Sequence, residues 1–189
     1  MDYKKIWNRI KLIITNPNSE WEKIYNETSD QNEIITRYAI PLIALGAITT
    51  FIGKSAMEVY SVYEGFMLAI TYFISTIAGL YISAIVISEL APNFETKKDY
   101  NASLKLIVYS STAALAAAVV ASLHPGLSFV GLFGLYSIYL FWVGLPVILG
   151  TPEDKKIGFV LISALIILAV TFIINFILQS IFVASAGIS

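Results

Sequence analysis

The sequence has no cysteine and only one histidine, His124, among its 189 residues. Without cysteine the chain cannot form disulfides, thiolate-ligated metal clusters or a thiol nucleophile. A lone histidine argues against a histidine metal site and a catalytic triad, and the sequence contains no Gly-x-Ser-x-Gly, P-loop or His-Glu-x-x-His motif. We therefore predict a protein that is not an enzyme, with no catalytic residue, no metal and no cofactor.

Charged residues are also scarce. They make up 13% of the chain, against roughly 25% in soluble domains, whereas hydrophobic residues reach 57%. A small folded chain exposes much of its surface, so this apolar excess cannot all lie in a core and must face lipid. The net charge of -1, without a long basic run, argues against a nucleic-acid partner.

Five apolar segments are each long enough to cross a bilayer once. About 20 residues, at roughly 1.5 Å per residue, match the hydrocarbon thickness of about 30 Å. The segments cover residues 34–53, 66–88, 104–123, 127–149 and 157–183. We predict an all-α integral membrane protein in which residues 34–189 form a bundle of five transmembrane helices.

The first 33 residues are polar overall and precede the bundle as a separate segment. Apolar side chains recur in it with helical spacing, whereas the basic side chains project largely elsewhere. The apolar stripe consists of Ile6, Trp7, Ile10, Ile13 and Ile14. Residues 1–33 are therefore predicted to be a cytoplasmic amphipathic helical segment, which either binds lipid or packs on the bundle.

Basic residues predict the orientation, because loops on the cytoplasmic side of a membrane carry an excess of lysine and arginine. With five spans, eleven of the twelve basic residues fall on one side and only Lys54 falls on the other. The eleven are Lys4, Lys5, Arg9, Lys11, Lys23, Arg37, Lys97, Lys98, Lys105, Lys155 and Lys156. We predict a cytoplasmic N-terminus and an external C-terminus.

The spans differ in composition. Small residues recur at every fourth position of the third span, which should be the central packed helix because such a line lets backbones approach closely. They are Ser110, Ala114, Ala118 and Ser122. The fifth span, rich in Ile, Leu and Phe, has the composition of a lipid-exposed helix, and Pro41 and Pro146 should kink the first and fourth spans.

Few polar side chains lie within the spans. Asn175 and Gln179, one turn apart in the fifth span, are the deepest strongly polar pair. With Tyr139 they form a candidate intramembrane polar site, although amides in spans also hold helices together. Glu89 and Lys105, at the cytoplasmic ends of the second and third spans, are a candidate ion pair or a solvated boundary.

Three stretches of the sequence share a pattern with known membrane proteins. They are Asn16-Pro17 with Glu20-Trp21-Glu22-Lys23-Ile24, then Asn101-Ala102-Ser103-Leu104-Lys105-Leu106 to Tyr109-Ser110, and finally Tyr136-x-x-Tyr139-x-x-x-x-Gly144-Leu145-Pro146 followed by Thr151-Pro152 and Lys155-Lys156-x-Gly158-Phe159. The pattern resembles the Yip domain of Ypt/Rab-interacting proteins, in particular its small bacterial branch, with Pro17, Trp21, Gly144, Pro146 and Pro152 as motif residues. The resemblance implies a five-helix bundle in the bacterial cytoplasmic membrane. It does not extend to GTPase binding, because the Asp-Leu-Tyr-Gly-Pro motif of eukaryotic relatives is absent.

The scarcity of charge inside the spans favours a protein that acts through packing and surface contacts. We expect a non-enzymatic Yip-type membrane protein whose partners are membrane lipids, a second copy of itself or another membrane protein. One alternative is a transporter, channel or lipid-moving protein with a pathway through the bundle, for which an ion or polar solute would need polar groups at depth. The other alternative is an accessory subunit of a larger transporter.

Overall fold

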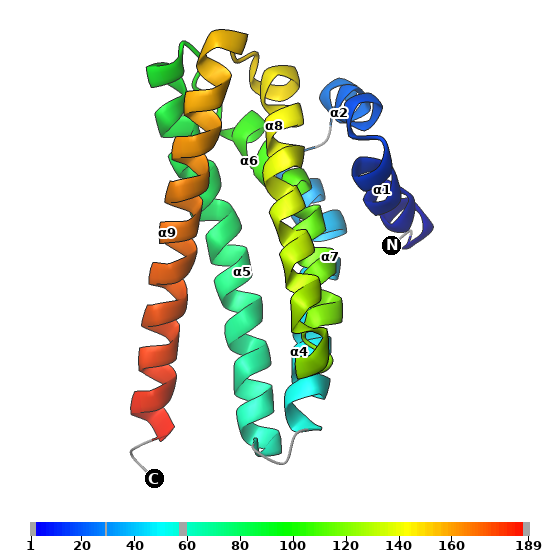
Figure 1. Cartoon of the computed structure of the whole chain (residues 1–189), viewed down its shortest axis with the longest axis vertical. Helices are drawn as coiled ribbons and strands as arrows, with labels where there is room; N and C mark the ends of the chain where they lie inside the picture. The colour runs from blue at the N-terminus through cyan, green and yellow to red at the C-terminus, as the bar shows by residue number, and fades with distance from the viewer. Residues whose placement is uncertain (1–2, 29, 57–59, 187–189) are drawn as a thin grey trace.

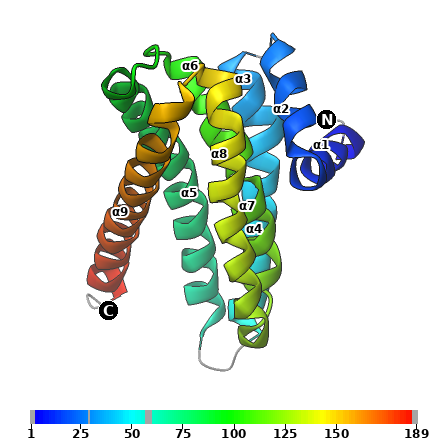
Figure 2. The same cartoon turned by 45° about the horizontal axis from the view of Figure 1, so that its top comes forward.

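The computed structural model describes residues 3–28, 30–56 and 60–186, except for the side chains of Gln179 and residues 181–186. All regular structure in these ranges is helical (Figures 1 and 2). The elements are α1 (Tyr3–Thr15), α2 (Pro17–Asn26), α3 (Gln31–Glu33), the π-helix η1 (Ile34–Ala39), α4 (Ile40–Ser55), α5 (Val62–Leu90), the 3₁₀-helix η2 (Ala91–Phe94), α6 (Tyr100–Ser110), α7 (Thr112–Ala121), the 3₁₀-helix η3 (Pro125–Leu135), α8 (Tyr136–Leu149) and α9 (Glu153–Ala186).

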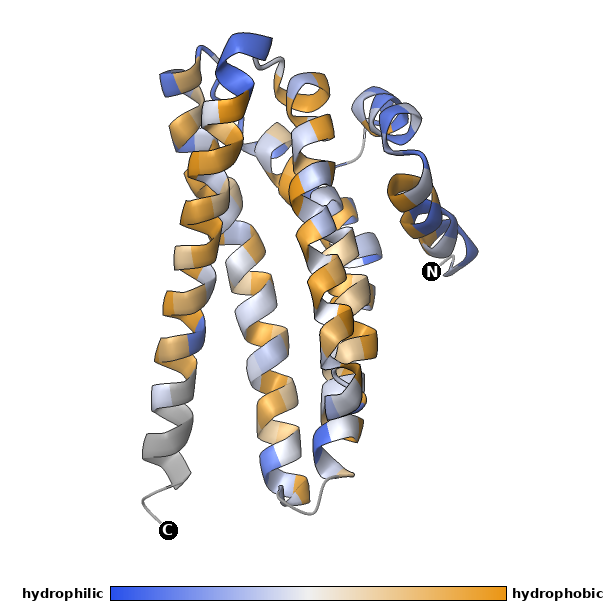
Figure 3. Cartoon of the chain, viewed as in Figure 1, coloured by the Kyte–Doolittle hydropathy of each residue, from blue (hydrophilic) through white to orange (hydrophobic). Residues whose placement is uncertain are grey.

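Five helical stretches in the described chain are long and apolar enough to cross a membrane, which confirms the predicted fold class. They are Gln31–Ser55, Val62–Phe94, Tyr100–Ala121, Pro125–Leu149 and Glu153–Leu178. Two short helices, α1 and α2, precede them. Apolar residues extend along the spans, whereas the most polar residues gather at one end of the bundle and on α1 and α2 (Figure 3).

The order of the helices in space differs from their order in the chain. Helix α5 packs against both α4 and α9, α6 packs against α5 and α8, and α7 packs against α4 and η3. Helix α9 lies at one flank of the bundle, and α1 and α2 lie at the opposite flank (Figures 1 and 2). The third span is the most buried of the five and the fifth is the least buried, as their residues predicted.

Small residues allow the first and third spans to touch at their backbones. Where the end of α7 meets α4, Ser122 Oγ donates a hydrogen bond to Thr49 Oγ1 at 2.8 Å. Gly53 lies so close that a Cβ at this position would collide with the carbonyl oxygen of Ser122 and stand 2.9 Å from that of Leu123. Glycine is therefore required at position 53 for this approach.

The two prolines expected to kink the spans lie in different helical surroundings, at the start of α4 and within α8. Pro41 follows the π-helix η1. Proline has no N–H and its ring crowds the carbonyl four residues earlier, and the wider turn of a π-helix accommodates both effects. Pro146 stays inside α8. The fourth span begins as the 3₁₀-helix η3 instead of the α-helix that its hydropathy suggests, and Gly131 and Gly134 weaken the α-helical preference there.

The linkers before α6 and before α9 meet at one end of the bundle, which we call the basic end because Lys97, Lys98, Lys155 and Lys156 lie in these linkers or directly after them. Lys155 Nζ pairs with Glu95 Oε1 at 3.0 Å, and Thr96 Oγ1 donates to Thr151 Oγ1 at 3.0 Å. The rings of Phe94 and Phe159 stack with centroids 4.6 Å apart. These contacts tie the second span to the fifth.

We expect Gly53→Ala to destabilise the bundle, because the added methyl group meets backbone atoms of Ser122 and Leu123 that cannot rotate away. Overpacking of this kind costs about 1–3 kcal/mol. Thermal unfolding in detergent, followed by circular dichroism, measures the change. Gly79→Ala is the matched control, because a Cβ at Gly79 meets nothing within 4 Å, and an equal effect of the two substitutions would contradict the prediction.

Candidate functional site

Helices α1 and α2 are joined through Asn16, run in different directions and pack against the flank of the bundle, and we call this unit the N-terminal hairpin (residues 3–26). The turn falls at Asn16, and Pro17 occupies the first turn of α2, where its missing N–H needs no partner. Ile13, Trp21 and Ile24 are fully buried against the spans. The apolar stripe predicted from the sequence therefore faces the bundle, except that Trp7 points outward and is 66% exposed.

Trp21 holds the hairpin to the fourth span. Its Nε1 donates a hydrogen bond to the carbonyl oxygen of Leu140 at 3.1 Å, and its ring meets Tyr109 edge to face, with centroids 6.4 Å apart. Gly144 makes room for the indole, since a Cβ at this position would stand 2.5 Å from Trp21 Cε2. Two motif residues from distant parts of the chain thus form a single contact.

The other motif residues lie around this contact. Pro17 begins α2, Pro146 lies in the last turn of α8, and Pro152 accepts backbone hydrogen bonds from Lys155 and Lys156 at 3.1 Å at the start of α9. They set where the helices begin and end. In the described structure the motif residues thus position helices and form no cluster of reactive side chains.

The charges on the inner side of the hairpin are paired. The Arg9 guanidinium bonds to Glu20 at 2.5 Å and also to Glu27, and it lies over the ring of Tyr109, 5.7 Å from the centroid. Burial lowers the pKa of Arg9, but the hydrogen bond and attraction of Glu27 outweigh it, so the pKa lies above its ordinary value. Glu20, only 3% exposed, is matched by Arg9 and by Lys23 at 3.3 Å.

Lys105 joins α6 to the hairpin, so the candidate ion pair between Lys105 and Glu89 is not formed in the described structure. Its Nζ donates to the carbonyl oxygens of Ile24 at 3.1 Å and Glu27 at 2.8 Å, at the C-terminal end of α2, where a lysine side chain can supply donors that the helix lacks. Glu89 pairs instead with Lys98 at 2.6 Å. The sequence placed Glu89 and Lys105 at the same end of the bundle, but Lys105 lies on the side of α6 that faces the hairpin.

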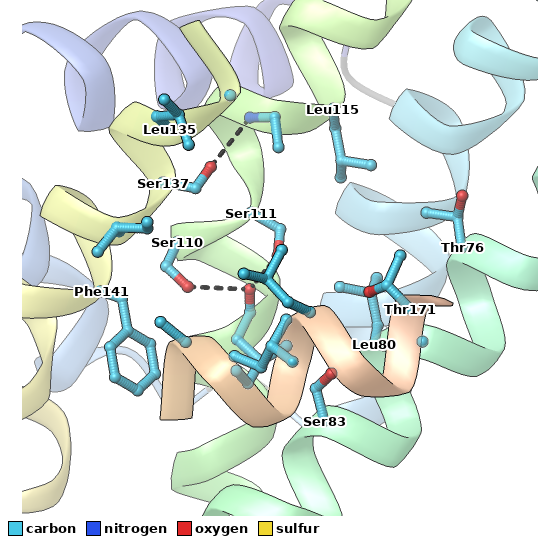
Figure 4. Close-up of a pocket in the computed structure, with 18 of the residues that line it drawn as sticks. Thr76, Leu80, Ser83, Ser110, Ser111, Leu115, Leu135, Ser137, Phe141 and Thr171 are labelled. Atoms are coloured by element: carbon cyan, nitrogen blue, oxygen red, sulfur yellow. Dashed lines mark hydrogen bonds between the residues drawn. The ribbon is translucent and has the colours of Figure 1, made fainter. Parts of the chain in front are cut away.

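A cavity of about 410 Å³ lies between α5, α6, α7, η3, α8 and α9 (Figure 4). Its walls are apolar side chains and glycines with several hydroxyl groups among them. The polar lining residues are Ser75, Thr76, Ser83, Ser110, Ser111, Ser137, Thr171 and Asn175. Among the described residues that line it, none is acidic, basic or histidine, so the cavity offers polar atoms without charge.

Most of these hydroxyl groups already have partners on the backbone. Ser110 and Ser111 both donate to the carbonyl oxygen of Ile107, at 3.1 and 2.8 Å. Ser137 Oγ accepts the N–H of Ala114 at 3.0 Å, in the first turn of α7, where a helix has no internal acceptor (Figure 4). The hydrogen bond to Ser137 of α8 thereby stabilises the interruption between α6 and α7. These serines bond to backbone groups and not to one another.

The candidate polar site is only partly assembled by the fold. Asn175 lines the cavity, and its Nδ2 donates to the carbonyl oxygen of Thr171 at 2.8 Å. Tyr139 is 45% exposed and packs on Tyr136, with centroids 5.1 Å apart, and it is not among the described residues that line the cavity. The side chain of Gln179 lies outside the described residues.

Sequence reasoning missed the serines of the cavity, which come from three different spans. Ser83, Ser110 and Ser137 are far apart in the chain, so no local spacing marks them as neighbours. The feature of the sequence that could have indicated them is the presence of hydroxyl groups in otherwise apolar spans. The small-residue line of the third span contained one of them, Ser110, and explained it by packing alone.

Comparison with known proteins identifies the family of the chain. Residues 11–174 match the family described as the Yip1 domain. The match includes α2, the start of the fifth span and both partners of the Trp21–Gly144 contact. No curated protein and no solved structure shows a significant match to the chain.

We expect Trp21→Phe to loosen the N-terminal hairpin, because phenylalanine lacks the Nε1 donor to the Leu140 carbonyl. Loss of one buried hydrogen bond costs about 1–2 kcal/mol, which should speed amide hydrogen exchange in α1 and α2 several-fold. Hydrogen exchange with mass spectrometry measures this. Trp7→Phe, at an exposed indole, should leave exchange unchanged, and equal protection in the two variants would refute the role of Trp21.

Proposed function

Because the chain belongs to the Yip1 domain family and is a multi-pass helical membrane protein, we propose that it works without catalysis, by binding membrane lipid inside the bundle. The occupant that we propose for the cavity is a phospholipid acyl chain. The observation that carries this proposal is the composition of the cavity wall, which combines apolar side chains with uncharged hydroxyls.

The size and chemistry of the cavity support this occupant. Its volume of about 410 Å³ lies in the range of ligand sites, which is roughly 300–1,000 Å³. Leu80, Leu115 and Phe141 offer apolar surface to a hydrocarbon chain, whereas an ion or a polar solute would need charged or strongly coordinating groups at this depth. An acyl chain needs neither.

The cavity also borders the surface that faces lipid. Leu135 of η3 and Leu168 of α9 both line it, and they are 64% and 65% exposed. Helix α9 packs against α5, α8 and η2 and is otherwise exposed along its length. A neighbouring lipid can therefore enter sideways beside α9 without passing through either end of the bundle.

We further propose that the protein belongs to the small bacterial branch of the family and lies in the bacterial cytoplasmic membrane. The three motif stretches support the branch. The excess of lysine and arginine at the basic end supports a cytoplasmic N-terminus and an external C-terminus.

Photo-crosslinking tests whether lipid enters the cavity. The full chain is reconstituted with a phosphatidylethanolamine that carries a diazirine in its acyl chain, irradiated, and mapped by mass spectrometry. We expect labels on Leu80, Ser110 and Phe141, which line the cavity and are at most 6% exposed. Labels confined to exposed residues of the lipid-facing surface would contradict the proposal.

A substitution that fills the cavity provides the second arm of the test. Gly79 lines the cavity and has open space around its Cβ position, so Gly79→Phe should reduce labelling of Ser110 and Phe141 at least threefold. Ile82→Phe, on the outer side of the same helix, should leave labelling unchanged. Selective flux of a small polar solute that Asn175→Leu abolishes would favour a transporter instead.

A further inference from the structure

The N-terminal hairpin lies beside the fourth span and not beyond its end. Trp21 bonds to the carbonyl oxygen of Leu140, and Tyr136 OH donates to that of Ile14 at 3.0 Å. Leu140 and Tyr136 are nine and thirteen residues from the end of α8 at Leu149, which corresponds to about 14 and 20 Å along a helix axis. The hairpin therefore occupies the flank of an apolar span, where lipid would otherwise contact α8 (Figures 1 and 2).

Helix α1 has two different sides at this position. Its inner side carries Ile6, Ile10 and Ile13, which pack on the bundle, together with Arg9, whose charge two glutamates match. Its outer side is not covered by any described part of the chain: Tyr3 is 72% and Trp7 66% exposed.

The outer side combines aromatic and basic residues in one row. Tyr3, Trp7 and Lys11 are spaced four residues apart, so they lie one above the other on the helix surface, and Lys4 is exposed next to them. Tyrosine and tryptophan favour the boundary between hydrocarbon and water, and lysine reaches from there to phosphate oxygens. Helix α1 has no acidic residue between Tyr3 and Thr15 that would repel a phosphate.

We propose that α1 lies at the boundary between the hydrocarbon core and the headgroups and that its outer row binds anionic phospholipids, with Lys4 and Lys11 reaching outward to their phosphates. The partner is a membrane surface and not a soluble anion, because the same row carries two large aromatic side chains. This binding surface is separate from the cavity, and it does not depend on whether the cavity holds lipid.

Spin labelling tests the depth of α1. The chain has no cysteine, so Asn8→Cys, on the exposed side of α1, and Lys97→Cys, exposed at the basic end, each give a single nitroxide in the full chain in liposomes. We expect the residue 8 label to be relaxed by oxygen, which concentrates in lipid, more than by a water-soluble nickel chelate. The residue 97 label should show the opposite. A label at residue 8 that behaves like the one at residue 97 overturns the proposal.

Lipid selectivity tests the role of the two lysines. Spin-labelled phosphatidylglycerol and phosphatidylcholine report the preference of the reconstituted protein for anionic lipid. We expect Lys4→Gln/Lys11→Gln to reduce this preference by about fivefold for each lysine removed, whereas Lys97→Gln/Lys98→Gln, with the same change in charge, should have a smaller effect. Equal losses in the two variants overturn the assignment to α1. Displacement of the labelled phosphatidylglycerol from the protein by free inorganic phosphate would show a simple anion site and would also overturn the proposal.

Discussion

Polar groups buried against an apolar span have no water to bond to, and the placement of the N-terminal hairpin against the fourth span depends on that constraint. Each polar group on its inner side is matched from within the protein: the Trp21 N–H by a carbonyl of α8, Arg9 by Glu20 and Glu27, and the end of α2 by Lys105. Gly144 makes this arrangement possible by leaving room for the indole. The hairpin thus behaves as part of the bundle, although its sequence is polar.

The cavity has its origin in irregularities of the helices around it. The third span breaks between α6 and α7, and Ser137 supplies the acceptor that the new helix start needs. The fourth span opposite begins as a 3₁₀-helix with glycines where larger side chains would fill space. Continuous α-helices with large side chains would close this volume. The same hydroxyls that stabilise the break give the cavity its uncharged polar character.

The sequence predicted the five spans and their relative burial well, because length and hydropathy alone determine which segments enter a bilayer. It failed where partners lie on other helices. Glu89 and Lys105 were placed at the correct end, but the side of α6 on which Lys105 lies depends on tertiary packing. Asn175 was identified as a polar residue at depth, yet Ser83 and Ser137 were not, because their common cavity exists only in three dimensions. The orientation stays a prediction.

The position of α9 has a consequence for how the protein is assembled. The fifth span, α9, packs beside α5, which belongs to the second span, and both supply walls of the cavity. As the spans enter the membrane in chain order, the hydroxyl groups of α5 and α6 face lipid or one another until α9 arrives. The cavity is therefore completed only when the fifth span inserts, and the arriving helix would enclose a lipid that already contacts those serines.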